Sequence, residues 1–269
     1  MAYVRARGVR FHVVDLGRDT GRSPVVMLHG LFTGSAASWF FTSAPALART
    51  RRVRLPDWRG HGLTERTPTG YDTATMADDL AALTADLPPF AIAGHSYGAT
   101  VAVRFARAHP GRVTALALVD PPFAAADTLV APPRPAADAH QDRPPAAASV
   151  RRDPPPDGVG GRFADVDLRR LAVPDAARGA VADLLKRTSL PYDLQADPPV
   201  TAAELAELAG LPLLAVVGSV SPFRAAADLV GGALPAARRH VLAGGHDLHI
   251  TARARLTTLL GAFLEESHA

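Results

Sequence analysis

The feature that most constrains the fold of this chain is residues 91–100, where an apolar run leads into Gly94-His95-Ser96-Tyr97-Gly98 and a helical pattern follows. A serine on a sharp turn between a strand and a helix needs small neighbours, because the two backbones pass close together. Such a turn exposes the Ser96 hydroxyl and directs backbone N–H groups at whatever the hydroxyl attacks. The alternative is a tight turn with an incidental serine, but the flanking strand and helix favour a nucleophile.

The composition is typical of one enzyme-sized domain. The chain has 269 residues, 48% of them hydrophobic, which suffices for the core of a single α/β domain with an insertion. The lack of cysteine excludes disulfides, thiolate metal ligands and a cysteine nucleophile, and it leaves the redox compartment open. The first residues lack the apolar stretch of a signal peptide, and no run approaches the roughly 18 apolar residues of a membrane span. We therefore expect a cytoplasmic protein with no membrane partner.

The charge of the chain does not indicate a nucleic-acid partner. The isoelectric point is near 9.8, yet the formal net charge is only +3. The basic residues are nearly all arginines, in scattered pairs at 51–52, 151–152, 169–170 and 238–239 without interleaved aromatics. A nucleic-acid footprint would concentrate such residues on one element. We interpret these arginines as solvated surface and expect a small-molecule substrate. An acidic substrate is compatible with this charge.

Strand and helix patterns alternate through most of the chain. An antiparallel strand pair that turns at Gly8 is expected within residues 2–16. Further strands are expected at 24–28, 52–56, 91–93, 113–119, 213–217 and 239–242, and helices at 36–48, 73–87, 97–109, 222–233 and 248–265. Because such alternation requires crossover connections, it predicts an α/β fold, with a mostly parallel eight-stranded sheet and helices on both faces.

Residues 121–198 interrupt this alternation and divide the predicted core into residues 1–120 and 199–269. The first half of the insertion is rich in alanine and proline, and prolines at this density neither extend helices nor pair in sheets. A helical pattern returns at 174–187, with Pro174 suited to the first turn. Long loops beside a candidate site are usually lids or disordered segments. We expect a partly irregular lid, with a disordered linker as the alternative for its first half.

Four motifs occur in a characteristic order along the chain. They are Leu28-His29-Gly30, Asp57-Trp58-Arg59-Gly60-His61-Gly62, Gly94-His95-Ser96-Tyr97-Gly98 and Gly244-Gly245-His246, and aromatic residues stand at Trp39 and Tyr71. In this order they resemble the α/β-hydrolase superfamily, and the likeness covers the chain outside the insertion. The resemblance implies the fold described above. It implies much less about the substrate, because this fold hosts many chemistries.

Histidine 246 is the base that the resemblance implies. His246 follows the last predicted strand on a glycine-rich loop, where members of the superfamily carry the catalytic histidine. His95 flanks the nucleophile and is expected to point away from the site. The segment His246-Asp247-Leu248-His249 could supply metal ligands, but its two histidines lack the i, i+4 spacing of the H-E-x-x-H motif and no further ligand is apparent, so no metal is expected.

The oxyanion hole implied by the resemblance consists of two backbone donors. They are the N–H of Tyr97, directly after the nucleophile, and the N–H of Leu31, directly after His29-Gly30. Backbone donors leave no residue signature, so this prediction depends on position alone. Gly30 supports it, because a glycine lets the loop approach the substrate.

The acid of the triad is where this chain departs from the common pattern. Most members of the superfamily place an aspartate in the loop after the strand at 213–217, but here that loop contains no carboxylate and Ser221 stands at the usual position. Some members, including many biosynthetic thioesterases, carry the acid one strand earlier. Asp120 lies there, at the end of the strand 113–119, and it preserves the chain order Ser, Asp, His. The alternative is an aspartate that ends the strand for structural reasons.

These residues predict a serine hydrolase that cleaves a carboxylic ester, thioester or lactone through an acyl-enzyme on Ser96. Phe32, Phe123 and Phe223 are the expected substrate-binding residues, although Phe123 and Phe223 could equally pack the lid on the core. No cofactor is expected, and the oligomeric state is left open. Two alternatives are a non-hydrolytic enzyme of the same fold, performing C–C cleavage, cyclisation or acyl transfer in secondary metabolism, and a binding protein with an impaired triad.

Overall fold

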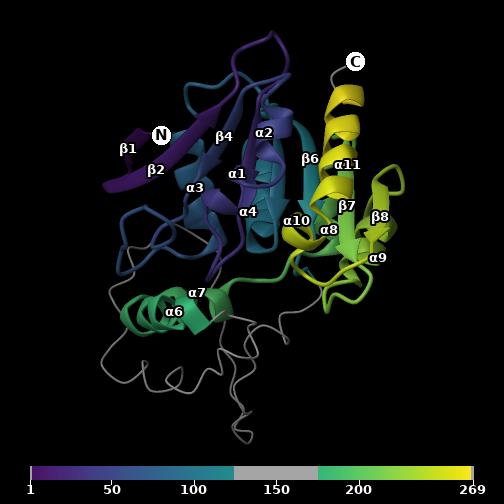
Figure 1. Cartoon of the computed structure of the whole chain (residues 1–269). Helices are drawn as coiled ribbons and strands as arrows, with labels where there is room; N and C mark the ends of the chain where they lie inside the picture. The colour runs from purple at the N-terminus through teal and green to yellow at the C-terminus, as the bar shows by residue number, and fades with distance from the viewer. Residues whose placement is uncertain (1, 124–174, 268–269) are drawn as a thin grey trace, which may run out of the picture.

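The computed structural model describes residues 2–123 and 175–267, and they form one eight-stranded sheet with helices on both faces (Figure 1). The strands are β1 (Ala2–Ala6), β2 (Val9–Leu16), β3 (Val25–Leu28), β4 (Val53–Pro56), β5 (Phe90–His95), β6 (Val113–Val119), β7 (Leu213–Gly218) and β8 (Arg238–Leu242). Their order in the sheet is β1-β2-β4-β3-β5-β6-β7-β8. The pairs β1–β2 and β2–β4 are antiparallel, and the other five neighbouring pairs are parallel. The predicted fold class is confirmed.

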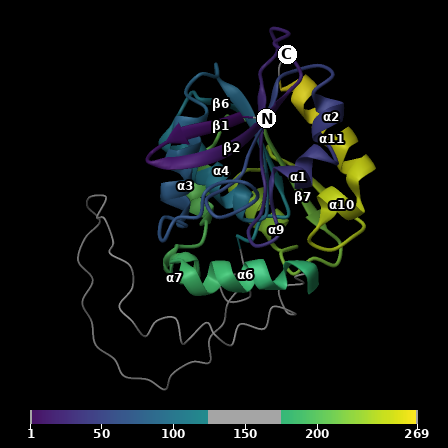
Figure 2. The same ribbon diagram turned by 60° about the vertical axis from the view of Figure 1, so that its left-hand side comes forward.

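The described residues contain ten helices, most of which lie in two layers, one on each face of the sheet. They are α1 (Ala36–Phe40), α2 (Ala44–Leu47), α3 (Thr73–Leu83), α4 (Tyr97–Ala108), α6 (Asp175–Arg187), α7 (Leu190–Ala196), α8 (Ala202–Ala206), α9 (Ala226–Ala233), α10 (Leu248–Thr251) and α11 (Arg253–Glu266). Figure 2 shows α3 and α4 on one side of the sheet and α2, α10 and α11 on the other. Within the described residues no helix is long and apolar enough to cross a membrane.

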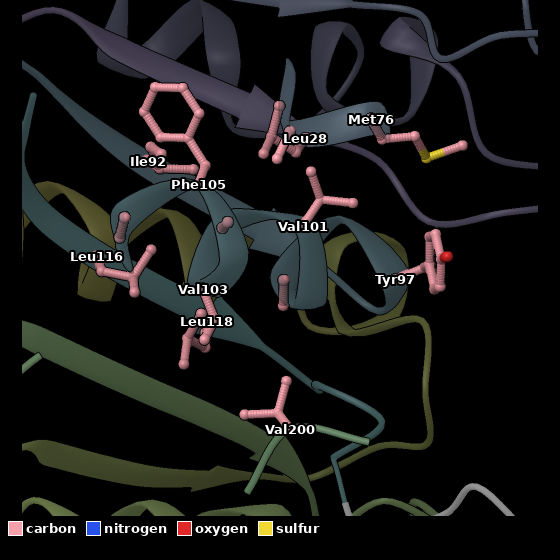
Figure 3. Close-up of a cluster of buried hydrophobic side chains, with 14 of the residues drawn as sticks. Leu28, Met76, Ile92, Tyr97, Val101, Val103, Phe105, Leu116, Leu118 and Val200 are labelled. Atoms are coloured by element: carbon pink, nitrogen blue, oxygen red, sulfur yellow. The ribbon is translucent and has the colours of Figure 1, made fainter. Parts of the chain in front are cut away.

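The central strands are buried on both faces, which explains their continuous apolar runs. Alternate side chains of β5 and β6 enter different cores: Ile92 and Leu116 pack with α3 and α4, whereas Ala91 and Ala117 face α1, α2 and α11. Figure 3 shows the first of these cores, with the α4 side chains Val101, Val103 and Phe105 lying over the sheet.

Two predicted helices are interrupted in the structure. The pattern at 36–48 forms α1 and α2, and Pro45 lies in the first turn of α2. A proline there has no N–H for a bond to the preceding turn, so one continuous helix cannot pass through it. The pattern at 248–265 likewise forms α10 and α11, which meet at Ala252 (φ −119°). The short α10 directly follows the loop of His246, so this second interruption adjoins the candidate site.

Of the predicted insertion at 121–198, the structure describes residues 121–123 and 175–198, and most of the first half, which was predicted to be irregular, lies outside the described residues. The helix predicted at 174–187 is α6, and α7 and α8 are additional helices that the sequence pattern did not reveal. Figure 1 shows α6 and α7 lying across the edge of the sheet at which the parallel strands end. Their apolar residues join the core of α3 and α4: Val181, Leu184, Leu185 and Leu190. The assignment of residues 121–198 as a lid stays a prediction.

Candidate active site

The turn that carries Ser96 is built by glycines on either side of it. Ser96 ends β5 and begins α4 with φ 53° and ψ −127°, a conformation that L-residues rarely adopt. A Cβ on Gly94 would lie 2.5 Å from the carbonyl oxygen of Gly98, and one on Gly98 would lie 2.6 Å from that of His29. Only glycine allows the strand, the turn and the neighbouring loop to pass this closely. Backbone strain of this kind is concentrated at functional sites.

The side chains predicted as nucleophile, base and acid form one hydrogen-bonded series. His246 Nε2 lies 2.9 Å from Ser96 Oγ, and His246 Nδ1 lies 2.6 Å from Asp120 Oδ2. An ionised carboxylate only accepts hydrogen bonds, so Nδ1–H donates to Asp120. The bare Nε2 then accepts the hydrogen bond of the Ser96 hydroxyl. The Asp120 side chain is fully buried and that of His246 is 30% exposed, so the imidazole is the accessible member of the pair.

The acid position is built from two strands and the loop that follows β7. Asp120 follows β6 with φ 46°, again in the left-handed region. Its Oδ1 accepts a hydrogen bond from the backbone N–H of Gly218 at 2.8 Å. Its Oδ2 accepts one from the Ser221 hydroxyl at 2.5 Å, in addition to that from His246. Ser221, which stands where the resemblance implies the usual acid, therefore contacts Asp120, the predicted acid, directly.

The loop predicted to supply an oxyanion donor passes beside the nucleophile. A Cβ on Gly30 would lie 3.0 Å from Ser96 Cβ and 3.5 Å from Ser96 Oγ. The N–H of Leu31 follows directly in this loop, and the N–H of Tyr97 follows Ser96 at the start of α4. Both predicted donors thus belong to segments that adjoin Ser96 Oγ, and their role stays a prediction.

The side chain of Tyr97 ties the start of α4 to the segment after α7. Its hydroxyl donates to Asp197 Oδ2 at 2.5 Å and lies 3.0 Å from the Tyr71 carbonyl oxygen. The N–H of Thr73 also donates to Asp197 Oδ2, at 2.8 Å. Burial raises the pKa of Tyr97 well above its ordinary value, and the nearby Asp197 carboxylate adds to this shift. Tyr97 therefore remains a neutral hydrogen-bond donor at physiological pH.

The three phenylalanines predicted to bind substrate differ in their surroundings. Phe32 adopts φ 67°, and its N–H donates to His61 Nε2 at 3.0 Å. Phe123 is buried in the core that α6 and α7 help to form. Phe223 is also buried, and its ring meets that of His246 edge-on with centroids 4.8 Å apart. Each has apolar contacts with the protein itself, and contact with a substrate stays a prediction.

The prediction that His95 points away from the site is wrong. Its ring centroid lies 4.7 Å from that of His246, and its Nε2 lies 3.0 Å from the His246 carbonyl oxygen. His95 alternates along β5 with Ala91 and Ala93, which face α11, so the pleat of the strand directs the His95 side chain to that same face. The loop that carries His246 also lies against this face. The sequence places His95 and His246 far apart, and only the fold brings them together.

His95 also belongs to a cluster with two residues that follow the base. Candidate ligand atoms of His95, Asp247 and His249 all lie within 4.8 Å of one another, so the structure supplies the third group that the sequence did not reveal. The His95 and His249 rings lie 4.2 Å apart at 48°. Burial lowers the pKa of His249 to about 4 and that of His95 well below its ordinary value. Both rings are therefore neutral at physiological pH, and the expected absence of a metal is not tested by this geometry.

The fold and this constellation define a recognisable class of protein, and comparison with known families agrees. The family model of the alpha/beta hydrolase fold matches residues 23–155. The chain belongs to the α/β-hydrolase superfamily. This confirms the resemblance that the four motifs indicated.

The relatives have diverse named activities. The chain is 36% identical to the soluble epoxide hydrolase of Corynebacterium sp. (strain C12) over 117 residues, which are 42% of this chain and 38% of that protein. It is 40% identical to the non-heme chloroperoxidase of Streptomyces lividans over 115 residues, 42% and 41% of the two chains. The chain thus matches about two-fifths of the length of these relatives. The structure of the enol-lactonase from Burkholderia xenovorans LB400 shares its fold, with a TM-score of 0.71 at 19% identity over 98% of this chain and 100% of that one.

Proposed function

We propose that this protein is a serine hydrolase that cleaves a carboxylic ester, thioester or lactone of a small molecule through an acyl-enzyme on Ser96. The observation that carries the proposal is the hydrogen-bonded series from Ser96 Oγ through His246 to Asp120, with contacts of 2.9 and 2.6 Å. A nucleophile, a base and an orienting acid at such distances are what acyl transfer by serine requires. The names of the relatives support hydrolytic chemistry in general.

In the proposed reaction, His246 Nε2 accepts the Ser96 proton while Oγ attacks the carbonyl carbon of the substrate. The carbonyl oxygen of the resulting tetrahedral intermediate carries the negative charge, and the N–H groups of Leu31 and Tyr97 donate to it. His246 then gives its proton to the leaving alkoxide or thiolate, and the acyl-enzyme forms. Water repeats the sequence: it gives one proton to His246, attacks the acyl carbon and releases a carboxylic acid, and Ser96 recovers its proton.

The buried Asp120 carboxylate has two effects in this scheme. Its Oδ2 holds Nδ1–H, so the lone pair of Nε2 faces Ser96. Its negative charge, buried next to the ring, stabilises the imidazolium that forms when Nε2 takes the proton. Apart from Asp120, each of the two backbone N–H groups that donate to the oxyanion, those of Leu31 and Tyr97, contributes roughly 2.7–4 kcal/mol of transition-state stabilisation in this scheme. Every proton in the scheme moves among the chain's own groups, the leaving group of the substrate and water, so the proposed reaction requires no cofactor.

A non-hydrolytic reaction on the same site is the second candidate. The relative named as a chloroperoxidase favours it, since the α/β-hydrolase fold carries more than hydrolytic activities. The two candidates differ in whether an acyl group becomes attached to Ser96. A binding protein with an impaired triad has less support, because His246 lies within hydrogen-bonding distance of both Ser96 and Asp120.

The test is labelling with a fluorophosphonate probe, followed by peptide mapping and by turnover of p-nitrophenyl esters. We expect the label on Ser96, slower labelling of the His246→Ala variant, and a burst of p-nitrophenol equal to the enzyme concentration. The Ser219→Ala variant is the control, because Ser219 lies on a loop near the site without belonging to the triad. Turnover of the ester without any label or acyl group on Ser96 would refute the proposal.

A further inference from the structure

The loop after β7 occupies the position of the usual acid but carries a hydroxyl there. Ser221 is buried, and its Oγ lies 2.5 Å from Asp120 Oδ2. His246 Nδ1 lies 2.6 Å from the same oxygen atom. The hydroxyl and the imidazole therefore both bind one carboxylate oxygen, from the two loops that follow β7 and β8.

We propose that Ser221 is a positioning residue that holds the Asp120 carboxylate in the orientation that His246 requires. The inference rests on the proposed function, since it concerns the acid of the same triad. In this proposal, the loop after β7 positions an acid that follows the neighbouring strand β6. Ser221 itself does not touch the reacting atoms, and it acts through Asp120.

The direction of the Ser221 hydroxyl is determined by a second hydrogen bond. The backbone N–H of Phe223 donates to Ser221 Oγ at 3.1 Å. With this lone pair occupied, the hydroxyl proton points to Asp120 Oδ2. A hydroxyl that donates to a carboxylate makes a charge-assisted hydrogen bond, roughly twice as strong as one between neutral groups. The short turn from Ser221 to Phe223 thus holds the acid while the Phe223 ring packs on the edge of His246.

The environment of Asp120 explains why such a contact is needed. Its carboxylate is fully buried, and a buried charge is costly unless hydrogen bonds satisfy its oxygens. The N–H of Gly218 binds Oδ1, which leaves the orientation of Oδ2 to Ser221 and His246. Without the hydroxyl, the imidazole alone would hold Oδ2, and the imidazole must itself be held in place.

The test compares Ser221→Ala, which removes the donor, with Ser221→Thr, which keeps a hydroxyl, and with Ser219→Ala as the matched control in the same loop. We expect Ser221→Ala to lower kcat by about three- to tenfold with KM within about twofold, because the loss concerns the transition state. Ser221→Thr should retain most of kcat, and Ser219→Ala should equal the original protein. Melting temperatures show whether each variant is folded.

A second readout follows the imidazole without any substrate. The ¹⁵N chemical shifts of the His246 ring, assigned by comparison with His246→Gln, report which nitrogen carries the proton. We expect the Nδ1–H form in the original protein and in Ser221→Thr, and a larger share of the Nε2–H form in Ser221→Ala. A purely structural serine would change the melting temperature but neither this ratio nor kcat.

The two readouts separate failure of the inference from failure of the proposed function. If Ser221→Ala keeps both the original kcat and the original ¹⁵N shifts, Ser221 does not position the acid. If the protein lacks esterase activity altogether, the proposed function fails, and the ¹⁵N shifts alone decide the role of Ser221. Unchanged shifts in that case would also overturn the inference.

Discussion

The nucleophile turn and the acid position are two strained corners at the same edge of the sheet, but they are built differently. Ser96 and Asp120 both have positive φ, 53° and 46°. The turn at Ser96 lies within one continuous segment, in which Gly94 and Gly98 leave room for the backbones. The Asp120 carboxylate is held instead by Gly218, Ser221 and His246, which lie roughly a hundred residues or more further along the chain. The first corner is local in the sequence and the second is assembled by the fold.

This difference predicts how each corner responds to change. A local turn depends on the shapes of adjacent residues, so its position in the sequence cannot move. A corner assembled from several loops needs only a carboxylate at the right place, and a different loop can supply it. The proposed triad is an example, since its predicted acid, Asp120, follows β6 while a hydroxyl stands at the position after β7.

Replacing Ser96 by alanine should have the largest effect. We expect Ser96→Ala to lower kcat for a p-nitrophenyl ester by at least about 10³-fold, because no neighbouring group can replace the nucleophile. Alanine is smaller than serine and fits the turn, so the melting temperature should change little. Activity within about tenfold of the original protein would show that the turn at Ser96 does not carry the reaction.

Combining Ser96→Ala with His246→Ala tests whether Ser96 and His246 act as one catalytic unit. We expect His246→Ala to lose about as much activity as Ser96→Ala, and the double variant to be hardly worse than either, because a base without its nucleophile contributes nothing. The measurement is kcat/KM for the three variants on one ester. Losses that multiply would indicate that His246 serves another group.

Changing Asp120 to asparagine tests whether the carboxylate at the acid position orients His246. Asparagine keeps the shape of the side chain but favours the wrong tautomer of His246, and we expect kcat to fall at least about 10²-fold with little change in KM. Steady-state kinetics on the same ester measure both constants. A variant with near-original kcat would mean that Asp120 ends its strand for structural reasons only.

Moving the carboxylate from position 120 to position 221 tests whether a different loop can supply the acid. In the Asp120→Asn background, we expect Ser221→Asp to raise kcat about tenfold, because Ser221 Oγ lies 2.5 Å from the oxygen that binds His246. Ser219→Asp in the same background is the control and should restore nothing. If neither aspartate restores activity, the acid position is as strictly located as the nucleophile turn.

The smallest expected effect concerns the loop that passes beside Ser96. Burial lowers the pKa of His61 to about 3, and its Nε2 accepts the N–H of Phe32 only when neutral. A histidine whose pKa is lowered in the folded state contributes stability that is present above its unfolded pKa of about 6.5 and is lost as the pH falls towards the folded value. The melting temperature of the original protein should therefore fall between about pH 6.5 and pH 3, and that of His61→Gln should fall less steeply.

The exposed His240 supplies the control for this prediction. His240→Gln should keep the full pH dependence, since this side chain is exposed and its replacement leaves the contact between His61 and Phe32 in place. Equal slopes for the original protein and for His61→Gln would show that the protonation of His61 does not limit stability in acid.

Sequence patterns predicted much of the fold because they record burial. The runs of apolar residues in β3, β5, β6 and β7 are those of strands covered on both faces, and all four strands form where they were expected. The patterns were less informative for helix ends: the helix expected at 36–48 is divided near Pro45, and α7 and α8 were not expected. The carboxylate also had to be inferred partly by elimination, since the loop of residues 218–223 contains none.

The sequence by itself determined the turn at Ser96, the order of the strands along the chain and the candidate histidine on its glycine-rich loop. The turn and the strands depend on local sterics and on periodicity, which neighbouring residues determine together, whereas the histidine was assigned from the resemblance to the α/β-hydrolase superfamily. Only the tertiary structure decided that Ser221 donates to Asp120, that His95 contacts His246, and that α6 and α7 lie over the edge where Ser96 emerges. These contacts join residues that are distant in the sequence, and parallel strands bring them together because their carboxyl ends meet at one edge of the sheet.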